Sequence, residues 1–123
     1  MELVYINDKV KSQCTSVKEA NKLFSGDTVL ARSLLARINA LTNAETIKDI
    51  IVQPTFHFHK LLNKNGNDLD GYFAIDVKTR REPWRIIIRP LNEEKEPYDP
   101  CNIDGIAGGV RIVRIMEVSK HYE

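Results

Sequence analysis

Two histidines, His57 and His59, and two arginines, Arg85 and Arg89, are the residues whose types and spacing best fit chemistry on a phosphate. One residue separates the two histidines and three separate the two arginines, so in an extended strand the members of each pair lie on the same face. Histidine exchanges protons near neutral pH, and arginine binds phosphate oxygens through a planar fork of N–H donors. The combination favours a site that acts on an anionic substrate.

Each pair also has a simpler explanation. The histidines can be half-exposed sheet residues, or they can belong to a zinc site, for which the sequence supplies no second ligand pair. Arg85 and Arg89 can instead pair with carboxylates on neighbouring strands, such as those of Asp76 or Glu117. These alternatives remain open at the level of sequence.

Other cationic and aromatic residues can contribute to the same surface. The cations most simply form a solvated surface, or else they contact a nucleic-acid backbone. They are Arg32, Arg37, Lys60, Lys64, Arg80, Arg81 and Lys120. His121 and Tyr122 follow the last predicted strand, where chain ends often fray. An aromatic side chain there can also stack on an RNA base.

The arginines lie in a predicted β-hairpin. Residues 72–77 and 84–89 are rich in aromatic and β-branched types, and they flank a polar turn. In the second strand the two arginines share one face, while Trp84, Ile86 and Ile88 share the other. This pattern predicts a sheet with one face on a core and one face partly open.

Helices are predicted in the first half of the chain. Ser16 begins a capping box, and apolar residues at helical spacing follow it as far as Gly26. Asp27 caps a second helix, unless Thr28 does so. A further capping box at Thr42 predicts a short helix that ends before Pro54.

The order of elements predicts the fold class. Residues 2–6, 56–62 and 110–118 are further predicted strands, and the second of these rests on a strict Phe-His alternation. Residues 92–105 hold five acids, one lysine and two prolines, so they should form a loop. We expect one α+β domain over residues 1–123, with an N-terminal strand and a helical hairpin packed on a mainly antiparallel twisted sheet.

Composition sets further limits. No apolar run approaches the ~18 residues of a membrane-spanning helix, and the first residues do not read as a signal peptide. Cys14 and Cys101 are expected to be free thiols in a reducing cytoplasm. The net charge is +1, but residues 92–105 carry −4, so the remainder carries +5. Glycine-rich phosphate loops and the GxSxG motif are absent from the sequence.

Several short segments resemble the RelE superfamily of bacterial toxins, and more closely its HigB-like branch, the plasmid-maintenance killer proteins of type II toxin–antitoxin systems. The similarity extends over about residues 19–122. The segments that carry it are Phe58-His59-Lys60-Leu61, Gly71-Tyr72-Phe73-Ala74-Ile75, Pro83-Trp84-Arg85-Ile86 and Lys120-His121-Tyr122.

The resemblance implies a RelE-like fold and a cytoplasmic toxin. Toxins of this branch enter the ribosomal A site, cleave messenger RNA and so inhibit translation, and a cognate HigA-like, DNA-binding antitoxin holds them inactive. The family's strand histidine falls on His59 and its sheet arginine on Arg85. The family's acidic–Tyr–His ending corresponds to Lys120, His121 and Tyr122, where lysine replaces the acid and the other two are reversed. The acidic segment at 92–105 is a second departure.

On this interpretation the protein is an endoribonuclease that needs no metal or cofactor. His59 or His121 would exchange protons, and Arg85 would stabilise the phosphate charge. Tyr122 would stack on or orient the nucleotide at the cleaved bond. The expected RNA-binding residues are Lys60, Lys64, Arg80, Arg81, Arg89 and Lys120. Two alternatives are a ParE-like toxin that poisons DNA gyrase without catalysis and an inactive interaction domain of the same fold.

Overall fold

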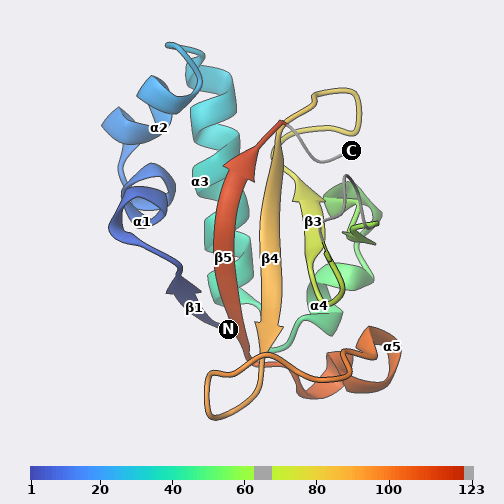
Figure 1. Cartoon of the computed structure of the whole chain (residues 1–123). Helices are drawn as coiled ribbons and strands as arrows, with labels where there is room; N and C mark the ends of the chain where they lie inside the picture. The colour runs from blue at the N-terminus through green and yellow to red at the C-terminus, as the bar shows by residue number, and fades with distance from the viewer. Residues whose placement is uncertain (63–67, 121–123) are drawn as a thin grey trace.

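The computed structural model describes residues 1–62 and 68–120. Helices cover one face of a five-stranded sheet with strand order β1-β5-β4-β3-β2 (Figure 1). The strands are β1 (Glu2–Tyr5), β2 (His59–Lys60), β3 (Phe73–Asp76), β4 (Arg85–Leu91) and β5 (Ile112–Ser119). β2 to β5 form antiparallel neighbours, as predicted, whereas β1 pairs with β5 in parallel, which the sequence did not indicate.

Most of the helices lie between β1 and β2 in the chain, and one lies between β4 and β5. They are α1 (Asp8–Thr15), α2 (Val17–Leu23), α3 (Thr28–Asn43), α4 (Lys48–Ile51) and α5 (Ile103–Ile106), with 3₁₀ turns η1 (Pro54–Phe56) and η2 (Ala107–Gly109). The predicted N-caps at Ser16 and Asp27 are confirmed, since their side chains accept hydrogen bonds from Glu19 N and from Val29 and Leu30 N.

One helix was missing from the predictions, and one predicted N-cap is wrong. Helix α1 was not predicted, because only Val10 and Cys14 of its eight residues are buried and the apolar pattern is weak. Thr42 does not cap a new helix. It lies within α3, where its hydroxyl donates to the carbonyl of Ile38 at 3.0 Å, and Asp49 accepts from the first backbone N–H groups of the next segment instead.

The core lies between the helices and one face of the sheet. Ile86 and Ile88 of β4 are fully buried there, while Ile87 belongs to a smaller cluster on the opposite face. The alternation predicted for β4 is therefore confirmed. Ile87 pairs with Glu117 but Ile88 pairs with Ile115, so Met116 is an extra residue in β5. This β-bulge places two consecutive residues of β5 on the open face.

Residues 92–105 are not wholly a loop, because α5 begins at Ile103 and leads into η2. Both cysteines are free thiols, as predicted, and burial raises the pKa of Cys14 to about 12. Within residues 1–62 and 68–120, no helix combines the length and the apolar composition needed to cross a bilayer.

Candidate functional site

The histidine segment is not the strand that its alternation predicted. Pro54 begins the turn η1, as proline favours the first position of a helical turn, and His57 then adopts a left-handed backbone with φ of +49°. Only residues 59–60 pair with β3, where His59 lies opposite Ala74. Histidine adopts this left-handed conformation more readily than most residues, yet it is unusual enough to indicate a local constraint.

Phe56 and Phe58 supply that constraint by anchoring the segment. Phe56 is buried in the main core, and Phe58 stacks on Phe73 of β3 with ring centroids 5.0 Å apart. The alternation predicted that the phenylalanines lie on one side and the histidines on the other, and this holds although the backbone is not a strand. Both phenylalanines pack on the core, while His57 and His59 contact each other. Their rings lie 4.5 Å apart, tilted by 30°.

His57 is held by a buried carboxylate. Its Nδ1 lies 3.2 Å from Oδ1 of Asp76, and the Nε of Arg85 lies 3.2 Å from the same oxygen. The side chains of Asp76 and Arg85 are only 2% and 6% exposed, whereas that of His57 is 29% exposed. Because a carboxylate only accepts, Nδ1 of His57 carries the hydrogen and Nε2 carries the lone pair of the neutral ring.

His59 is fixed by a different acceptor. Its Nδ1 lies 2.7 Å from the backbone carbonyl oxygen of His57. A carbonyl also only accepts, so this nitrogen is the donor and Nε2 again carries the lone pair. Both imidazoles therefore have a defined tautomer, set by Asp76 for His57 and by the His57 carbonyl for His59.

Arg85 is brought to this cluster, but its guanidinium is already engaged. Besides contacting Asp76, it donates to the carbonyls of Arg80 and Trp84, each at 2.9 Å, and to that of Glu82. The pairing with Asp76, one of the two explanations open from the sequence, is present. These contacts use most of the five N–H donors, so Arg85 acts mainly on Asp76 and on the turn before β4.

Arg37 of α3 supports the same region. Its guanidinium donates to the carbonyls of Thr55, Val77 and Lys78 at 3.0–3.3 Å and lies 4.6 Å from the centroid of Phe56. Burial lowers the pKa of Arg37, and the carboxylate of Asp76 opposes this effect. The expectation that Arg37 is simply solvated is wrong, since it ties α3 to the ends of η1 and β3.

Replacing Arg37 by alanine should therefore lower the free energy of unfolding by about 1.5–3 kcal/mol, the usual contribution of hydrogen bonds to a charged group. Arg32 is the matched control, because it lies exposed on the same helix and its replacement should change stability by less than about 0.5 kcal/mol. Urea unfolding followed by circular dichroism measures both. Equal, small effects would show that Arg37 is not a structural link.

The other predicted RNA-binding residues are dispersed. Lys60 and Arg89 line a hollow of about 630 Å³ together with residues 97–101, and neither His59 nor Arg85 borders it. Arg89 donates to the hydroxyl of Tyr72 at 3.1 Å and lies over its ring. This part of the predicted surface is separate from the histidine cluster.

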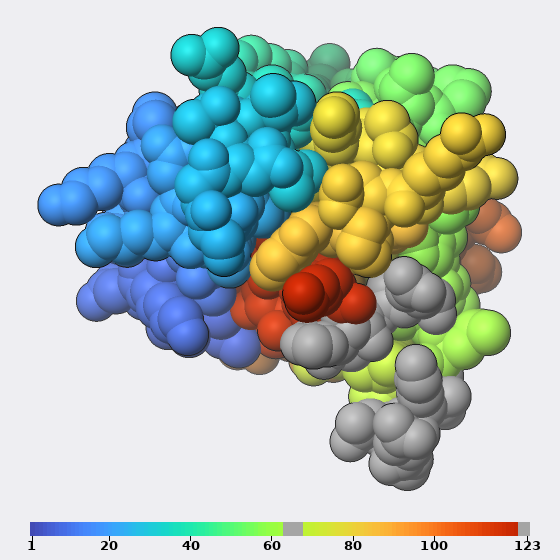
Figure 2. Space-filling view, turned by 90° about the horizontal axis from the view of Figure 1, so that it is seen from above, coloured from blue at the N-terminus to red at the C-terminus, as the bar shows by residue number. Residues whose placement is uncertain are grey.

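The turn before β4 and the end of β5 lie nearer the cluster. Arg80 and Arg81 are exposed on the turn, and Nζ of Lys120 lies 5.7 Å from the ring centroid of Trp84. Ser119 pairs with Arg85, which places the end of β5 beside the site. Figure 2 views this end of the molecule, where the end of β5 (red) lies beside the turn (yellow). The predicted residues Lys64, His121 and Tyr122 lie outside the described residues.

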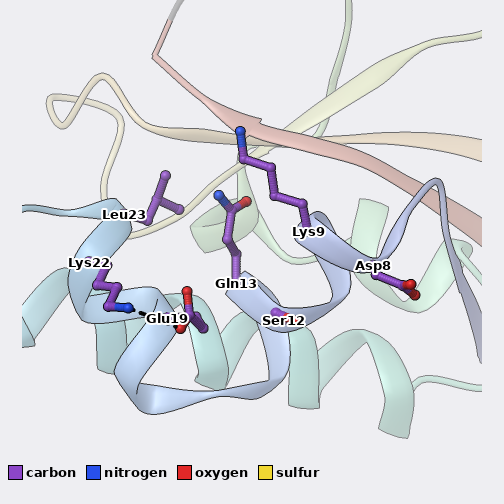
Figure 3. A pocket seen from close by; sticks show the side chains of 7 residues that line it. All are labelled: Asp8, Lys9, Ser12, Gln13, Glu19, Lys22 and Leu23. Carbon is purple, nitrogen blue, oxygen red and sulfur yellow. Dashed lines mark hydrogen bonds and ion pairs between the residues drawn. The ribbon is translucent and has the colours of Figure 1, made fainter.

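A second hollow, of about 470 Å³, is lined by residues of α1 and α2 (Figure 3). Lys22 and Glu19 form an ion pair of 3.5 Å at its rim. Lys9, Gln13 and Leu23 also border the neighbouring hollow beside Trp84. Of the predicted catalytic residues that the structure describes, neither His59 nor Arg85 lines the hollow of Figure 3.

His57 and Asp76 are the residues of the cluster that were not predicted as catalytic. The Phe-His alternation singled out His57, and the hairpin register places Asp76 opposite Arg85, so both could be suspected from the sequence. What the sequence could not show is that one carboxylate oxygen contacts both side chains. In residues 1–62 and 68–120, no group of three or more His, Cys, Asp or Glu side chains could hold a metal ion.

Comparison of the chain with protein-family models, with curated proteins and with solved structures finds no match.

Proposed function

We propose that this protein is a toxin of a type II toxin–antitoxin system, with a RelE-like, HigB-like fold, that cleaves messenger RNA on the ribosome. The observation that supports this best is the pair of adjacent imidazoles, each with Nδ1 bound to a fixed acceptor. Two imidazoles with defined tautomers, in contact with each other, supply the proton acceptor and the proton donor that cleavage at a ribose 2′-hydroxyl requires.

The reaction needs no metal. A base removes the proton from the 2′-hydroxyl, O2′ attacks the adjacent phosphorus, and an acid protonates the departing O5′. The products are a 2′,3′-cyclic phosphate and a 5′-hydroxyl. Arg85 contributes by holding Asp76, and the exposed Arg80, Arg81 and Lys120 are the cations best placed to contact the RNA phosphates.

The ribosome would supply alignment of the substrate, and such alignment can contribute a large part of the rate enhancement. The charge of +5 outside residues 92–105 suits a partner rich in phosphate. A cognate HigA-like antitoxin would bind the toxin and keep it inactive.

Brief induction of the chain in bacteria, with messenger 5′ ends mapped, tests this function. One reporter is translated, and a second lacks its start codon. We expect cuts only in the translated reporter, and we expect His59→Ala to reduce them by about 10²–10⁴-fold because a general acid or base is lost. Lys18→Ala, which alters an exposed lysine of α2, serves as the control and should retain the cleavage.

The other outcomes separate the alternatives. Growth arrest without cuts would replace this proposal with a gyrase-poisoning toxin. The absence of arrest would favour an inactive interaction domain. Cleavage by His59→Ala at the wild-type rate would remove His59 from the mechanism.

A further inference from the structure

The two histidines of the site are held by chemically different acceptors. Asp76, a buried carboxylate, contacts Nδ1 of His57, whereas a neutral backbone carbonyl contacts Nδ1 of His59. The difference matters because a carboxylate stabilises a protonated imidazole far more than a carbonyl does. The two rings are therefore suited to different halves of an acid–base reaction.

We propose that His57, oriented by Asp76, is the general acid of RNA cleavage and that His59 is the general base. This inference rests on the proposed function and adds a catalytic residue that the family resemblance does not supply. It also assigns Asp76 as a positioning residue that acts through His57.

The hydrogen bonds support this division of roles. When His57 is protonated, Nδ1–H remains bound to Asp76, and the second proton is on Nε2, from which it can be given to a leaving oxygen. When His59 is neutral, Nδ1–H remains bound to the carbonyl of His57, and Nε2 offers its lone pair to a 2′-hydroxyl. Neither ring needs to rotate during the reaction.

The close contact between the rings favours the charge state that this mechanism needs. Their centroids are 4.5 Å apart, so two imidazolium ions would repel each other. One imidazolium beside one neutral imidazole avoids that repulsion. Of the two rings, His57 is the one that contacts a carboxylate, that of Asp76, whose same oxygen also contacts Arg85.

RNA cleavage by this pair needs no further reactant. His59 Nε2 takes the proton of the 2′-hydroxyl as the bond from O2′ to phosphorus forms. The bond from phosphorus to O5′ breaks, and O5′ takes the proton from Nε2 of His57. The site ends with His59 protonated and His57 neutral, and a proton must return from His59 to His57, directly or through water, before the next cleavage.

An RNA whose leaving O5′ is replaced by sulfur tests the assignment, since a thiolate leaves without protonation. Purified protein is mixed with programmed ribosomes carrying either the ordinary or the sulfur-containing RNA in the A site. We expect His57→Asn and His59→Ala each to slow cleavage of the ordinary RNA by about 10²–10⁴-fold. The sulfur substitution should restore His57→Asn to within about tenfold of the wild type, and it should leave His59→Ala slow.

Asparagine is chosen at His57 because it tolerates the left-handed backbone there, and His57→Gly, which also tolerates it, is the second variant. A purely structural role for His57 would give slow cleavage of both RNAs and would overturn the assignment. Ordinary cleavage by both His57 variants at the wild-type rate would overturn it as well. If the wild type cleaves neither RNA, the proposed function itself fails, which is a different result.

Discussion

Replacing Arg85 by alanine is expected to lower the free energy of unfolding by about 3–5 kcal/mol, because the change leaves a buried carboxylate without its partner. Asp76 is 2% exposed, and Arg85 is its partner on the neighbouring strand. The same guanidinium also holds the turn before β4 through the carbonyls of Arg80 and Trp84. Urea unfolding of purified protein measures the change.

The control is Arg81→Ala, an exposed arginine of the same turn, for which we expect a change within about 0.5 kcal/mol. A second variant, Arg85→Met combined with Asp76→Leu, removes both charges and should recover much of the loss, since no unpaired charge remains. If Arg85→Ala proved as stable as the wild type, the guanidinium would be free to bind phosphate, as the family resemblance implies.

Replacing Phe73 by alanine should be comparably costly, at about 3–5 kcal/mol for a buried phenylalanine. Phe73 is fully buried in β3, and Phe58 stacks on it. The loss should extend to the site, because Phe58 lies between the two histidines in the chain. We expect the ring signals of His57 and His59 in nuclear magnetic resonance spectra to shift toward those of exposed histidine.

Leu62→Ala provides the comparison for Phe73→Ala. Leu62 is 79% exposed, so its truncation should change stability by less than about 0.5 kcal/mol and leave the histidine signals in place. A stability loss in Phe73→Ala with unchanged histidine signals would show that the aromatic stack supports the core without positioning the site.

The parts of the fold that follow from local patterns could be predicted. The α+β class, the antiparallel order of β2 to β5 and the buried face of β4 depend on alternation and on capping residues, which are visible in a short window of sequence. The prediction of a strand over residues 56–62 was largely wrong, because Pro54 starts a 3₁₀ turn and His57 has a left-handed backbone. The alternation of Phe and His therefore does not reflect an extended strand.

The candidate site was predicted only in part, because its decisive contacts join distant residues. Arg85 was singled out from the sequence, but its contact with Asp76, its hydrogen bonds to three carbonyls and its burial could not be predicted. Arg37 appeared solvated on its helix, since nothing in that helix reveals carbonyls that arrive from residues 55, 77 and 78. Such contacts exist only once tertiary structure is known.

The parallel pairing of β1 with β5 has a consequence for synthesis. Glu2 pairs with Ile112, so the first strand leaves the ribosome long before its partner exists. Closing so long a loop is slow and must await the end of β5, whose Ser119 lies opposite Arg85. The N-terminal helices and the β3–β4 hairpin that pairs Asp76 with Arg85 can form on the nascent chain, but the five-stranded sheet is completed only when β5 is added. The complete sheet around the candidate site therefore forms only after β5 has been synthesised.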